Sequence, residues 1–352
     1  MNHLKSAALI TCLLIILALA ASCQSGAADT GYILSGGEKI VPEYVMTVDG
    51  IKVPFDEYRY VYMYMRTSYD GGDLTYWDGD GSEIENLKKS VDNYCTETCV
   101  MKKMAEEKKL SLTEEETKNV EDYLAGIISS YSSKADFEKD LASAYMSEAL
   151  YRRLLCDNAL SRKLYDCYYG ENGENTFSDE EYIEYYDSVY YCAKQILVYF
   201  RDGENFESCE ESKAKIDAAY EKLQNGADFD EVMKEYGEDE SMTGDRKTGY
   251  HFKSGEMITG FYDAAVKLDI GEYSEPVMTT LGFHIILRCP IDPEVRDSMK
   301  EEVLVGYYDD YNNWNGGYYE ERFYDMIRGR VEDGVEIVFD ASHDLISPYT
   351  MK

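Results

Sequence analysis

The amino-acid sequence predicts a multidomain α+β protein. Apolar residues at helical spacing and two helix-capping motifs indicate a mainly helical first half, residues 44–190. Short apolar runs then alternate with short helical stretches over about 100 residues, which is the pattern of a separate α+β domain. The last segment is predicted to return to helix and to end in a strand. A body of about 300 residues is long enough for two or three domains.

The first 22 residues have the layout of a bacterial lipoprotein signal peptide. A short, charged start precedes an apolar run over residues 7–21, which is shorter than the about 20 residues of a transmembrane helix. Cys23 follows this run, and we expect it to become the lipidated first residue of the mature chain. Because Leu19 lies one position earlier than in the commonest motif, ordinary cleavage near Ala20 that leaves Cys23 as a free thiol is the alternative.

Residues 23–43 are predicted to form a flexible tether between that anchor and the folded body. They are rich in Ser, Gly and Ala and show no apolar periodicity. A cysteine with more than one acyl chain would bind the membrane stably, because a single chain binds only marginally. The sequence therefore predicts a chain held by lipid at the extracytoplasmic face of the cell membrane.

The acidity of the chain limits its partners. The formal net charge is −34, and it becomes −35 when the signal peptide, which holds Lys5 and no acidic residue, is removed. This charge argues against binding to nucleic acid and against electrostatic attraction to anionic lipid. An acidic surface that only keeps the protein soluble explains the composition equally well.

The nine cysteines do not form a disulfide framework. Cys12 lies in the signal peptide and Cys23 is the expected anchor, which leaves an odd and scattered set. Cys95 and Cys99 lie one helical turn apart, but the mature chain has only three histidines and no second cysteine pair at zinc spacing. We therefore expect structural thiols, no metal and no cofactor. The remaining cysteines are Cys95, Cys99, Cys156, Cys167, Cys192, Cys209 and Cys289.

The helical first half is predicted to open with a β-hairpin. Two β runs, residues 44–48 and 51–53, flank an Asp-Gly turn, and Pro54 then begins a helix at its favoured first position. A long amphipathic helix is expected over residues 83–109. Two further helices are expected to begin at capping boxes, in which a hydroxyl and a Glu three residues later satisfy free backbone N–H groups. These pairs are Thr113 with Glu116 and Ser178 with Glu181.

The second half begins with a β run at residues 192–199. Three helices and a closing strand are expected after it, at residues 212–224, 229–236, 260–268 and 282–287. Beyond two prolines the sequence predicts one long helix over residues 296–328, followed by a strand at 335–339.

Residues 193–291 resemble a parvulin-type peptidyl-prolyl isomerase domain along their whole length. Five matching motifs occur in the order of that family. They are Lys194-Gln195-Ile196-Leu197-Val198, Gly226-Ala227-Asp228-Phe229, Gly255-Glu256-Met257 with Phe261, Gly271-Glu272-Tyr273-Ser274-Glu275-Pro276-Val277, and Gly282-Phe283-His284-Ile285-Ile286. The resemblance implies an FKBP-like α+β domain over residues 191–291 that catalyses cis–trans isomerisation of X–Pro bonds.

The segments on either side resemble the chaperone domain of the PrsA/SurA-type extracytoplasmic foldases. The opening hairpin and helix, with residues 102–108 before the Thr113 cap, are similar to its SurA-N-like first part, and residues 292–352 suit the segment that completes it. The isomerase domain would then be inserted into a helical chaperone domain. The partners implied are unfolded or newly exported polypeptides, and a membrane through the lipid anchor. A homodimer is compatible with the sequence.

The same resemblance assigns roles to site residues. Met257 and Phe261 would form the floor of an apolar cup for the proline ring, with Phe252 also binding substrate. His284 would belong to a hydrogen-bonded network beneath the cup. The polar residue that faces the substrate carbonyl falls within residues 237–240, where Asp239 is our choice and a slip of one position is left open.

The sequence departs from the family pattern at two places. Gln195 stands where the family has its first histidine, and glutamine can donate and accept hydrogen bonds but cannot titrate. The loop over residues 241–250 lacks the usual Gly-Gly-Asp-Leu motif. Gln195 is therefore expected to complete the catalytic set with Asp239 and His284, in an altered form.

Each predicted site residue also has a simpler structural explanation. Met257 and Phe261 could be core side chains, His284 a satisfied histidine on a central strand, and Asp239 an acid at a helix end. Two functions follow, an active isomerase with a chaperone domain or a holdase chaperone with an inactive parvulin fold. Gln195 favours the second. A solute-binding lipoprotein is disfavoured, because the chain lacks two large α/β lobes.

Overall fold

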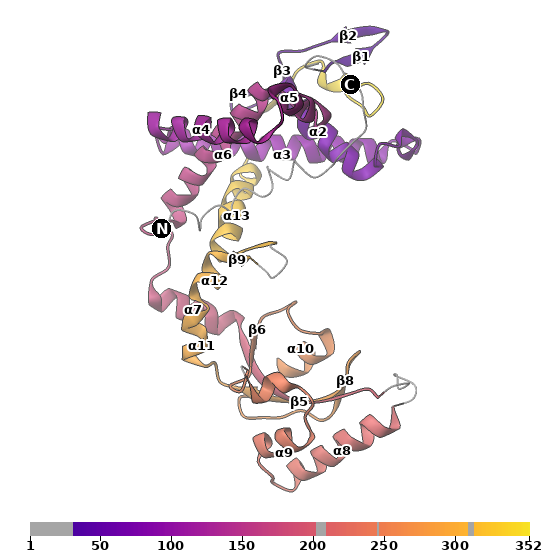
Figure 1. The fold of residues 1–352 in the computed structure, drawn as a ribbon, viewed down its shortest axis with the longest axis vertical. Coiled ribbons are helices and arrows are strands. Elements are labelled where there is room, and N and C mark those ends of the chain that lie inside the picture. The colour runs from indigo at the N-terminus through magenta and orange to yellow at the C-terminus, as the bar shows by residue number, and fades with distance from the viewer. Residues whose placement is uncertain (1–30, 202–208, 245, 309–312) are drawn as a thin grey trace. The chain divides into compact units, whose positions relative to one another are not determined.

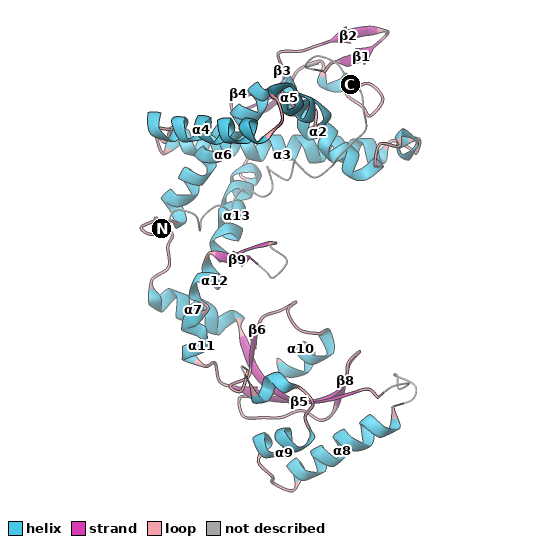
Figure 2. Cartoon of the chain, in the orientation of Figure 1, coloured by secondary structure: helices cyan, strands magenta, loops and turns pink. Residues whose placement is uncertain are grey.

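Two folded units make up the described part of the chain. A computed structural model describes residues 31–201, 209–244, 246–308 and 313–352, so the signal peptide, Cys23 and the start of the predicted tether lie outside it. The first unit combines the chain up to Thr176 with Leu304–Lys352, and the second is Phe177–Val303 (Figure 1). The first is mainly helical and the second packs helices on a sheet (Figure 2), which confirms the predicted multidomain α+β fold.

The first unit is built around the long helix α3 (Ser82–Glu107), which lies close to the predicted residues 83–109. Its buried apolar residues, among them Leu87, Val91 and Val100, recur at helical spacing and face the neighbouring helices. Helices α2, α6 and α13 all contact α3. The other helices of this unit are α2 (Phe55–Asp70), α4 (Glu114–Ser130), α5 (Lys134–Ser143), α6 (Glu148–Tyr169) and α13 (Tyr318–Glu332), with a short 3-10 turn at Leu74–Trp77.

The C-terminal segment completes a sheet that the N-terminal segment begins. The predicted hairpin forms from β3 (Tyr44–Val48) and β4 (Ile51–Pro54), and β11 (Ile337–Phe339) pairs antiparallel with β3. Arg330 of α13 also forms an ion pair with Glu107 at the end of α3, at 2.7 Å. Segments nearly 300 residues apart therefore form one unit, as the resemblance implied.

Part of the predicted tether is ordered, and that prediction is wrong for residues 33–40. Strands β1 (Ile33–Ser35) and β2 (Glu38–Ile40) form a hairpin around Gly36 and Gly37, which both have positive φ angles. The Ile33 side chain is fully buried, and the backbone of this segment hydrogen-bonds to the last residues of the chain. This partner is the far end of the sequence, so local composition could not reveal it.

Both predicted capping boxes are present. Glu116 N donates to Thr113 Oγ1 at 3.2 Å, and the Glu116 carboxylate accepts from Thr113 N at 2.7 Å. Ser178 and Glu181 make the same pair of bonds at the start of α7 (Asp179–Val189). Each box satisfies N–H groups that the first turn of a helix leaves free.

The second unit contains a four-stranded antiparallel sheet in the order β6-β5-β8-β7. Helices α8 and α9 cover one face of the sheet and α10 covers the other (Figure 1). Helix α9 has the predicted bounds, and α8 and α10 lie within three residues of theirs. The elements are β5 (Tyr191–Tyr199), β6 (Tyr250–Phe252), β7 (Val277–Met278), β8 (Gly282–Cys289), α8 (Glu210–Gln224), α9 (Phe229–Tyr236) and α10 (Thr259–Ala265).

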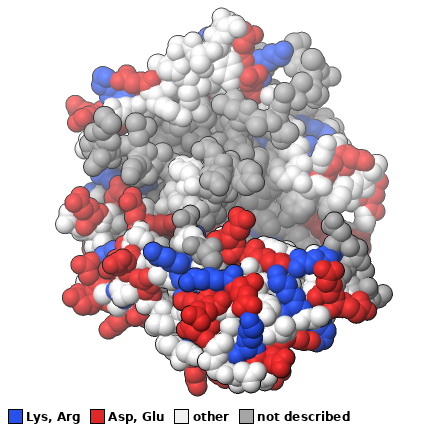
Figure 3. Space-filling view, turned by 60° about the horizontal axis from the view of Figure 1, so that its bottom comes forward, with Lys and Arg blue, Asp and Glu red and all other residues white. Residues whose placement is uncertain are grey.

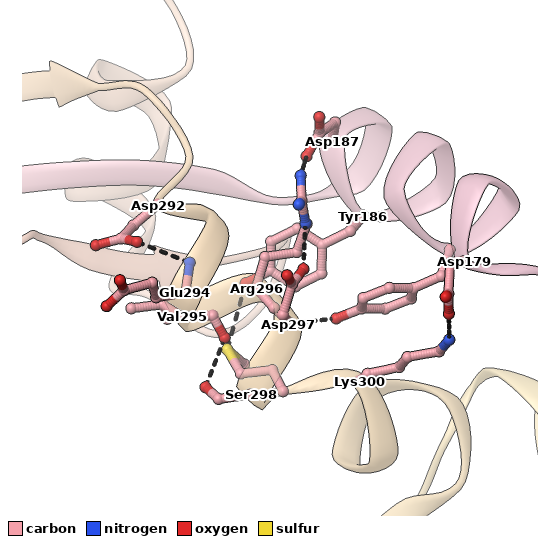
Figure 4. Close-up of polar contacts among 12 residues, drawn as sticks. Asp179, Tyr186, Asp187, Asp292, Glu294, Val295, Arg296, Asp297, Ser298 and Lys300 are labelled. Atoms are coloured by element: carbon pink, nitrogen blue, oxygen red, sulfur yellow. Dashed lines mark hydrogen bonds and ion pairs between the residues drawn. The ribbon is translucent and has the colours of Figure 1, made fainter.

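Helix α7 and the short helix α11 (Pro293–Ser298) belong to this second unit as well. Figure 4 shows the contacts that join them. The Tyr182 hydroxyl donates to the backbone oxygen of Arg296 at 2.6 Å, and Tyr186 reaches the sulfur of Met299 at 3.3 Å. Arg296 also lies 3.7 Å from Asp187, and Lys300 pairs with Asp179. The predicted limits of the isomerase domain, residues 191 and 291, stay a prediction. The compact second unit is longer at both ends, because it extends from residue 177 to residue 303.

The single helix predicted over residues 296–328 is wrong. The chain instead forms α11, α12 (Lys300–Leu304), the strands β9 (Gly306–Tyr308) and β10 (Trp314–Gly316), and then α13. Gly306 has a φ of +113°, and a side chain there would meet the Asn315 carbonyl oxygen at 2.4 Å. The helical periodicity on both sides concealed this glycine-dependent interruption.

Charges of both signs are interspersed on the face that Figure 3 presents, where the lower part of Figure 1 comes forward. Ion pairs within the second unit include Lys222 with Glu235 at 2.6 Å and Lys215 with Glu238 at 2.6 Å. Within the described ranges, no helix is both long and apolar enough to cross a membrane.

Candidate active site

The pairing of β5 with β8 determines which side chains meet. Because successive residues of a strand point to opposite faces, Ile196 and Val198 face α8 and α9, where they join a buried apolar cluster. Gln195 and, on β8, His284 point to the other face, which α10 covers. Leu197 lies directly opposite His284, so Gln195 and His284 are diagonal neighbours across the two strands.

A chain of hydrogen bonds crosses this face from Thr279 to Asp239. His284 Nδ1 lies 2.7 Å from Gln195 Oε1, which can only accept, so Nδ1 carries the proton. His284 Nε2 therefore accepts from the Thr279 hydroxyl at 2.7 Å. At the other end, Gln195 Nε2 donates to Asp239 Oδ2 at 2.6 Å. One amide thus accepts from a neutral histidine and donates to a carboxylate.

Asp239 is held in place by donors from three directions. It caps the 3-10 turn at Glu240–Thr243, with Oδ1 accepting from Ser241 N at 3.1 Å. Oδ2 accepts from the Tyr250 hydroxyl at 2.8 Å in addition to the Gln195 amide. Asp239 is therefore both the helix-end acid and a member of the network. Asp239 and Tyr250 are only half-buried, whereas Gln195, His284 and Thr279 are buried, so solvent reaches the network at the Asp239 end.

Burial controls the protonation of His284. Its side chain is 2% exposed, and desolvation lowers the pKa of His284 to about 4, against the opposing effect of the Asp239 charge. The imidazole is neutral at neutral pH, which agrees with its role as donor at one nitrogen and acceptor at the other. His284 is thus a satisfied core histidine that also links the network to Thr279.

The apolar residues of the predicted cup are packed together but largely inaccessible. Phe252 and Phe261 are each 1% exposed, and their rings lie edge to face with centroids 5.6 Å apart. Phe261 also lies edge to face against His284 at 5.9 Å. Met257 packs against the same cluster and is only partly buried. It precedes α10, which begins at Thr259, so it does not share a helical face with Phe261.

Two residues of the network were missed by sequence reasoning. Thr279 lies in the loop before β8, five residues from His284, and its only sequence signal is a hydroxyl close to a predicted site residue. Tyr250 begins β6, the edge strand next to β5, and reaches Asp239 through tertiary contact alone. Within the described ranges, no group of three or more potential ligands could hold a metal ion.

Comparison with known proteins defines the class of this site. Residues 196–289 match the family model described as "Rotamase: PPIC-type PPIASE domain". This segment carries β8, α10 and the end of β5, together with Thr279, His284, Asp239 and Tyr250 of the network, and Gln195 lies one position before it. The second unit therefore contains a parvulin-type domain of the peptidyl-prolyl cis-trans isomerase class.

The curated relatives of this chain include foldases. Foldase protein PrsA 3 of Bacillus anthracis is 41% identical over 92 residues, which is 24% of this chain and 31% of the relative. Foldase protein PrsA of Caldanaerobacter subterraneus is 24% identical over 272 residues, or 76% of this chain and 79% of the relative. The match thus spans about a third of the length of the Bacillus anthracis relative and most of the length of the Caldanaerobacter relative. It is similar to PrsA/SurA-type foldases with a parvulin domain.

Solved structures with similar chains carry related names. PrsA from Bacillus cereus is 20% identical, with 74% of this chain and 92% of that chain covered and a TM-score of 0.36. A SurA-like chaperone from Campylobacter jejuni, one of the pair PEB4 and Cj1289, is 10% identical, with 85% and 100% covered and a TM-score of 0.30.

Proposed function

We propose that this chain is an extracytoplasmic foldase that isomerises X–Pro bonds in newly exported polypeptides and binds them while they fold. The observation that carries this proposal is the continuous hydrogen-bond chain from Thr279 through His284 and Gln195 to Asp239, within a domain of the isomerase class.

Isomerisation of an X–Pro bond breaks no covalent bond. The catalyst has to stabilise the twisted amide more than the planar amide. A planar amide carries partial negative charge on its oxygen, and this charge decreases when the C–N bond twists and resonance is lost. A carboxylate close to that oxygen disfavours the planar state more than the twisted one, and so lowers the barrier. Asp239 is suited to this role because Gln195 and Tyr250 hold its Oδ2 and leave the group half-exposed.

The apolar side of the site would take the proline ring. Met257 is its accessible member, and Phe252 and Phe261 support it from beneath. Gln195 preserves the connectivity of the network without a titrating group, so catalysis here requires no proton transfer through this position.

A second function is favoured by a different observation. Phe252 and Phe261 are almost completely buried, which leaves little apolar surface for a proline ring unless Met257 moves. In this alternative the parvulin-type domain has no isomerase activity, and the chain acts as a holdase for exported polypeptides.

The isomerase proposal can be tested by NMR exchange spectroscopy on short X-Pro peptides with an acidic, basic or apolar residue before proline. The full chain should accelerate cis/trans exchange, and Asp239→Asn should reduce the acceleration about 10-fold or more. Asp263→Asn, an exposed acid on α10, is the matched control and should leave it unchanged. No acceleration with any peptide, from a folded chain, would reject the isomerase and leave the holdase.

A further inference from the structure

The helical unit contains a cavity that the isomerase chemistry does not use. It lies among α2, α3, α6 and α13 and has a volume of about 90 Å³. A cavity needs about 10–15 Å³ of such volume to hold one water molecule, so this cavity is large enough for a side chain. All of its lining residues belong to the first unit.

The charged residues that line this cavity are all acidic, so their side chains accept hydrogen bonds. Glu57, Glu97 and Asp157 line it, and no Lys or Arg is among the described lining residues. Lys102 lies behind this wall and pairs with Asp157 at 2.7 Å and more distantly with Glu57 at 3.7 Å. Arg153 approaches Glu57 from the side at 3.4 Å.

Glu97 is the one of these three carboxylates that has no ion pair within the described residues. It is partly buried, and it makes no hydrogen bond or ion pair with another residue in the described part of the chain. Burial raises the pKa of Glu97, and only the more distant charge of Arg328 opposes this shift. Burial likewise raises the pKa of Glu57 in spite of Lys102. A cation inside the cavity would stabilise both carboxylates.

Asn158 provides a second, independent indication of a ligand. It lines the same cavity, its residue is 6% exposed, and its side-chain oxygen has no hydrogen-bond partner among the described residues. An unpaired buried acceptor costs about 1–3 kcal/mol. A ligand that donates hydrogen bonds from within the cavity would remove this cost.

The remaining walls are apolar and aromatic. Val61, Met101, Leu154 and Ile327 supply the aliphatic part, and Tyr60 adds a ring. Lysine and arginine side chains combine an aliphatic stem with a cationic head, and this arrangement of apolar walls and acceptors complements both parts.

We propose that this cavity binds a basic side chain, an arginine or lysine, of an unfolded polypeptide. Arginine should bind more tightly, because its guanidinium has five N–H donors for several acceptors, whereas a lysine ammonium has three. The inference rests on the proposed polypeptide-binding function and adds to it a preference at one subsite.

The test compares two peptides that differ in one charge. A fluorescein-labelled ten-residue peptide of Gly, Ser, Ala and Leu carries a central arginine, and its partner carries citrulline, the neutral analogue of the same shape. Anisotropy titration with the full chain should give about tenfold tighter binding of the arginine peptide. Glu97→Gln should reduce this ratio to about one.

The matched control separates the cavity from the general acidity of the chain. Glu85 is an exposed acid on the same helix α3 and does not line the cavity, so Glu85→Gln should leave the ratio unchanged. Unfolding curves for both variants check that each remains folded. The comparison of the two peptides with the unsubstituted chain needs no variant at all.

Three other results of these titrations would contradict the proposal. A preference for arginine that persists in Glu97→Gln would be due to overall charge and would reject the cavity. Equal binding of both peptides would also reject it, while polypeptide binding would stand. Binding of neither peptide would reject the polypeptide-binding function together with the subsite.

Discussion

Gln195 performs with one amide the two hydrogen-bonding tasks at the centre of the site. Its oxygen accepts from His284 and its nitrogen donates to Asp239, so the orientation of the amide is fixed by its partners. A histidine at this position would offer one donor and one acceptor as well, through ring nitrogens. The replacement of the family histidine therefore preserves the direction of the network and removes only its ability to titrate.

Substitution of Gln195 tests the importance of this connection. Gln195→Leu has a similar shape but leaves the His284 N–H without its buried acceptor and removes a donor from Asp239. We expect the free energy of unfolding to fall by about 2–3 kcal/mol, measured by urea denaturation, and X-Pro exchange to slow in NMR. Gln195→His is the control and should retain most of both. Wild-type exchange in Gln195→Leu would contradict a catalytic network.

The neutral His284 makes stability depend on pH. In the unfolded chain this group titrates near 6.5, whereas its pKa in the folded protein is about 4, so between these values only the unfolded state binds the proton. Stability is therefore lost as the pH falls from about 7 to about 4, by about 3 kcal/mol for this group. His284→Gln should flatten this part of the curve in urea unfolding at a series of pH values. Parallel curves for the two proteins would exclude His284 as the cause.

At the scale of elements, the central strands bring two cysteines together. Cys192 on β5 lies directly opposite Cys289 on β8, both side chains are buried, and all seven described cysteines are free thiols. Cys192 Sγ donates to the Thr248 oxygen at 3.5 Å and Cys289 Sγ to the Leu287 oxygen at 3.6 Å, and the neighbouring Cys192 thiol lowers the pKa of Cys289 to about 7. Directly opposed residues in an antiparallel pair have Cα atoms about 4.5–5.5 Å apart, within the range that a disulfide spans.

We expect this pair to form a disulfide when the protein is treated with oxidised glutathione. The two thiols give up two electrons and two protons, and glutathione disulfide is reduced to two glutathione molecules. Thiol counting after denaturation should show two fewer thiols, and peptide mapping should link β5 to β8. Cys289→Ser is the control and should retain Cys192 as a thiol or a glutathione adduct. An unchanged thiol count would show that the strands hold the sulfurs apart.

The contact of α7 with α11 is a second feature at this scale. The Asp292 N–H donates to His251 Nε2 at 3.3 Å, so His251 Nδ1 carries the proton and faces the Tyr186 hydroxyl at 2.8 Å. Tyr186 is then free to donate to the sulfur of Met299 (Figure 4). Burial lowers the pKa of His251, which keeps it in this neutral form. Helix α7 and the start of α11, which both lie outside the family match, thus contact the edge strand β6 through His251.

At the scale of the whole molecule, these helices determine which excised fragment should fold. Tyr182 and Tyr186 of α7 are almost completely buried, and a fragment of residues 191–291 would lose both. Residues 177–303 should unfold cooperatively in urea and be more stable than 191–291 by about 3 kcal/mol or more. Equal stability of the two fragments would mean that α7 and α11 add nothing to the second unit.

We propose that Cys23, which lies outside the described residues, anchors the chain to the membrane. In a bacterial host the full chain should fractionate with membranes and carry acyl groups detectable by mass spectrometry. Cys23→Ser should move it to the soluble extracytoplasmic fraction, whereas Cys209→Ser should not. A soluble, unacylated protein in every case would favour ordinary cleavage near Ala20.

Much of the fold was predictable because its signals are local. The capping boxes, the long helix α3 and the bounds of α9 follow from side-chain spacing and cap chemistry within a few residues. The failures are segments whose structure depends on a distant partner. Residues 32–34 pair with the end of the chain, and Gly306 interrupts a helical pattern because the backbone at Asn315 approaches it.

The sequence by itself determined the order of the parts, the motifs of the parvulin-type domain and the candidates Gln195, Asp239 and His284. Only the tertiary structure decided that these three share one hydrogen-bond chain, that Thr279 and Tyr250 join it, and that Phe252 and Phe261 are buried. The reason is physical. Motifs record short-range spacing, whereas hydrogen-bond partners and burial depend on strand register and on contacts between residues up to 89 positions apart.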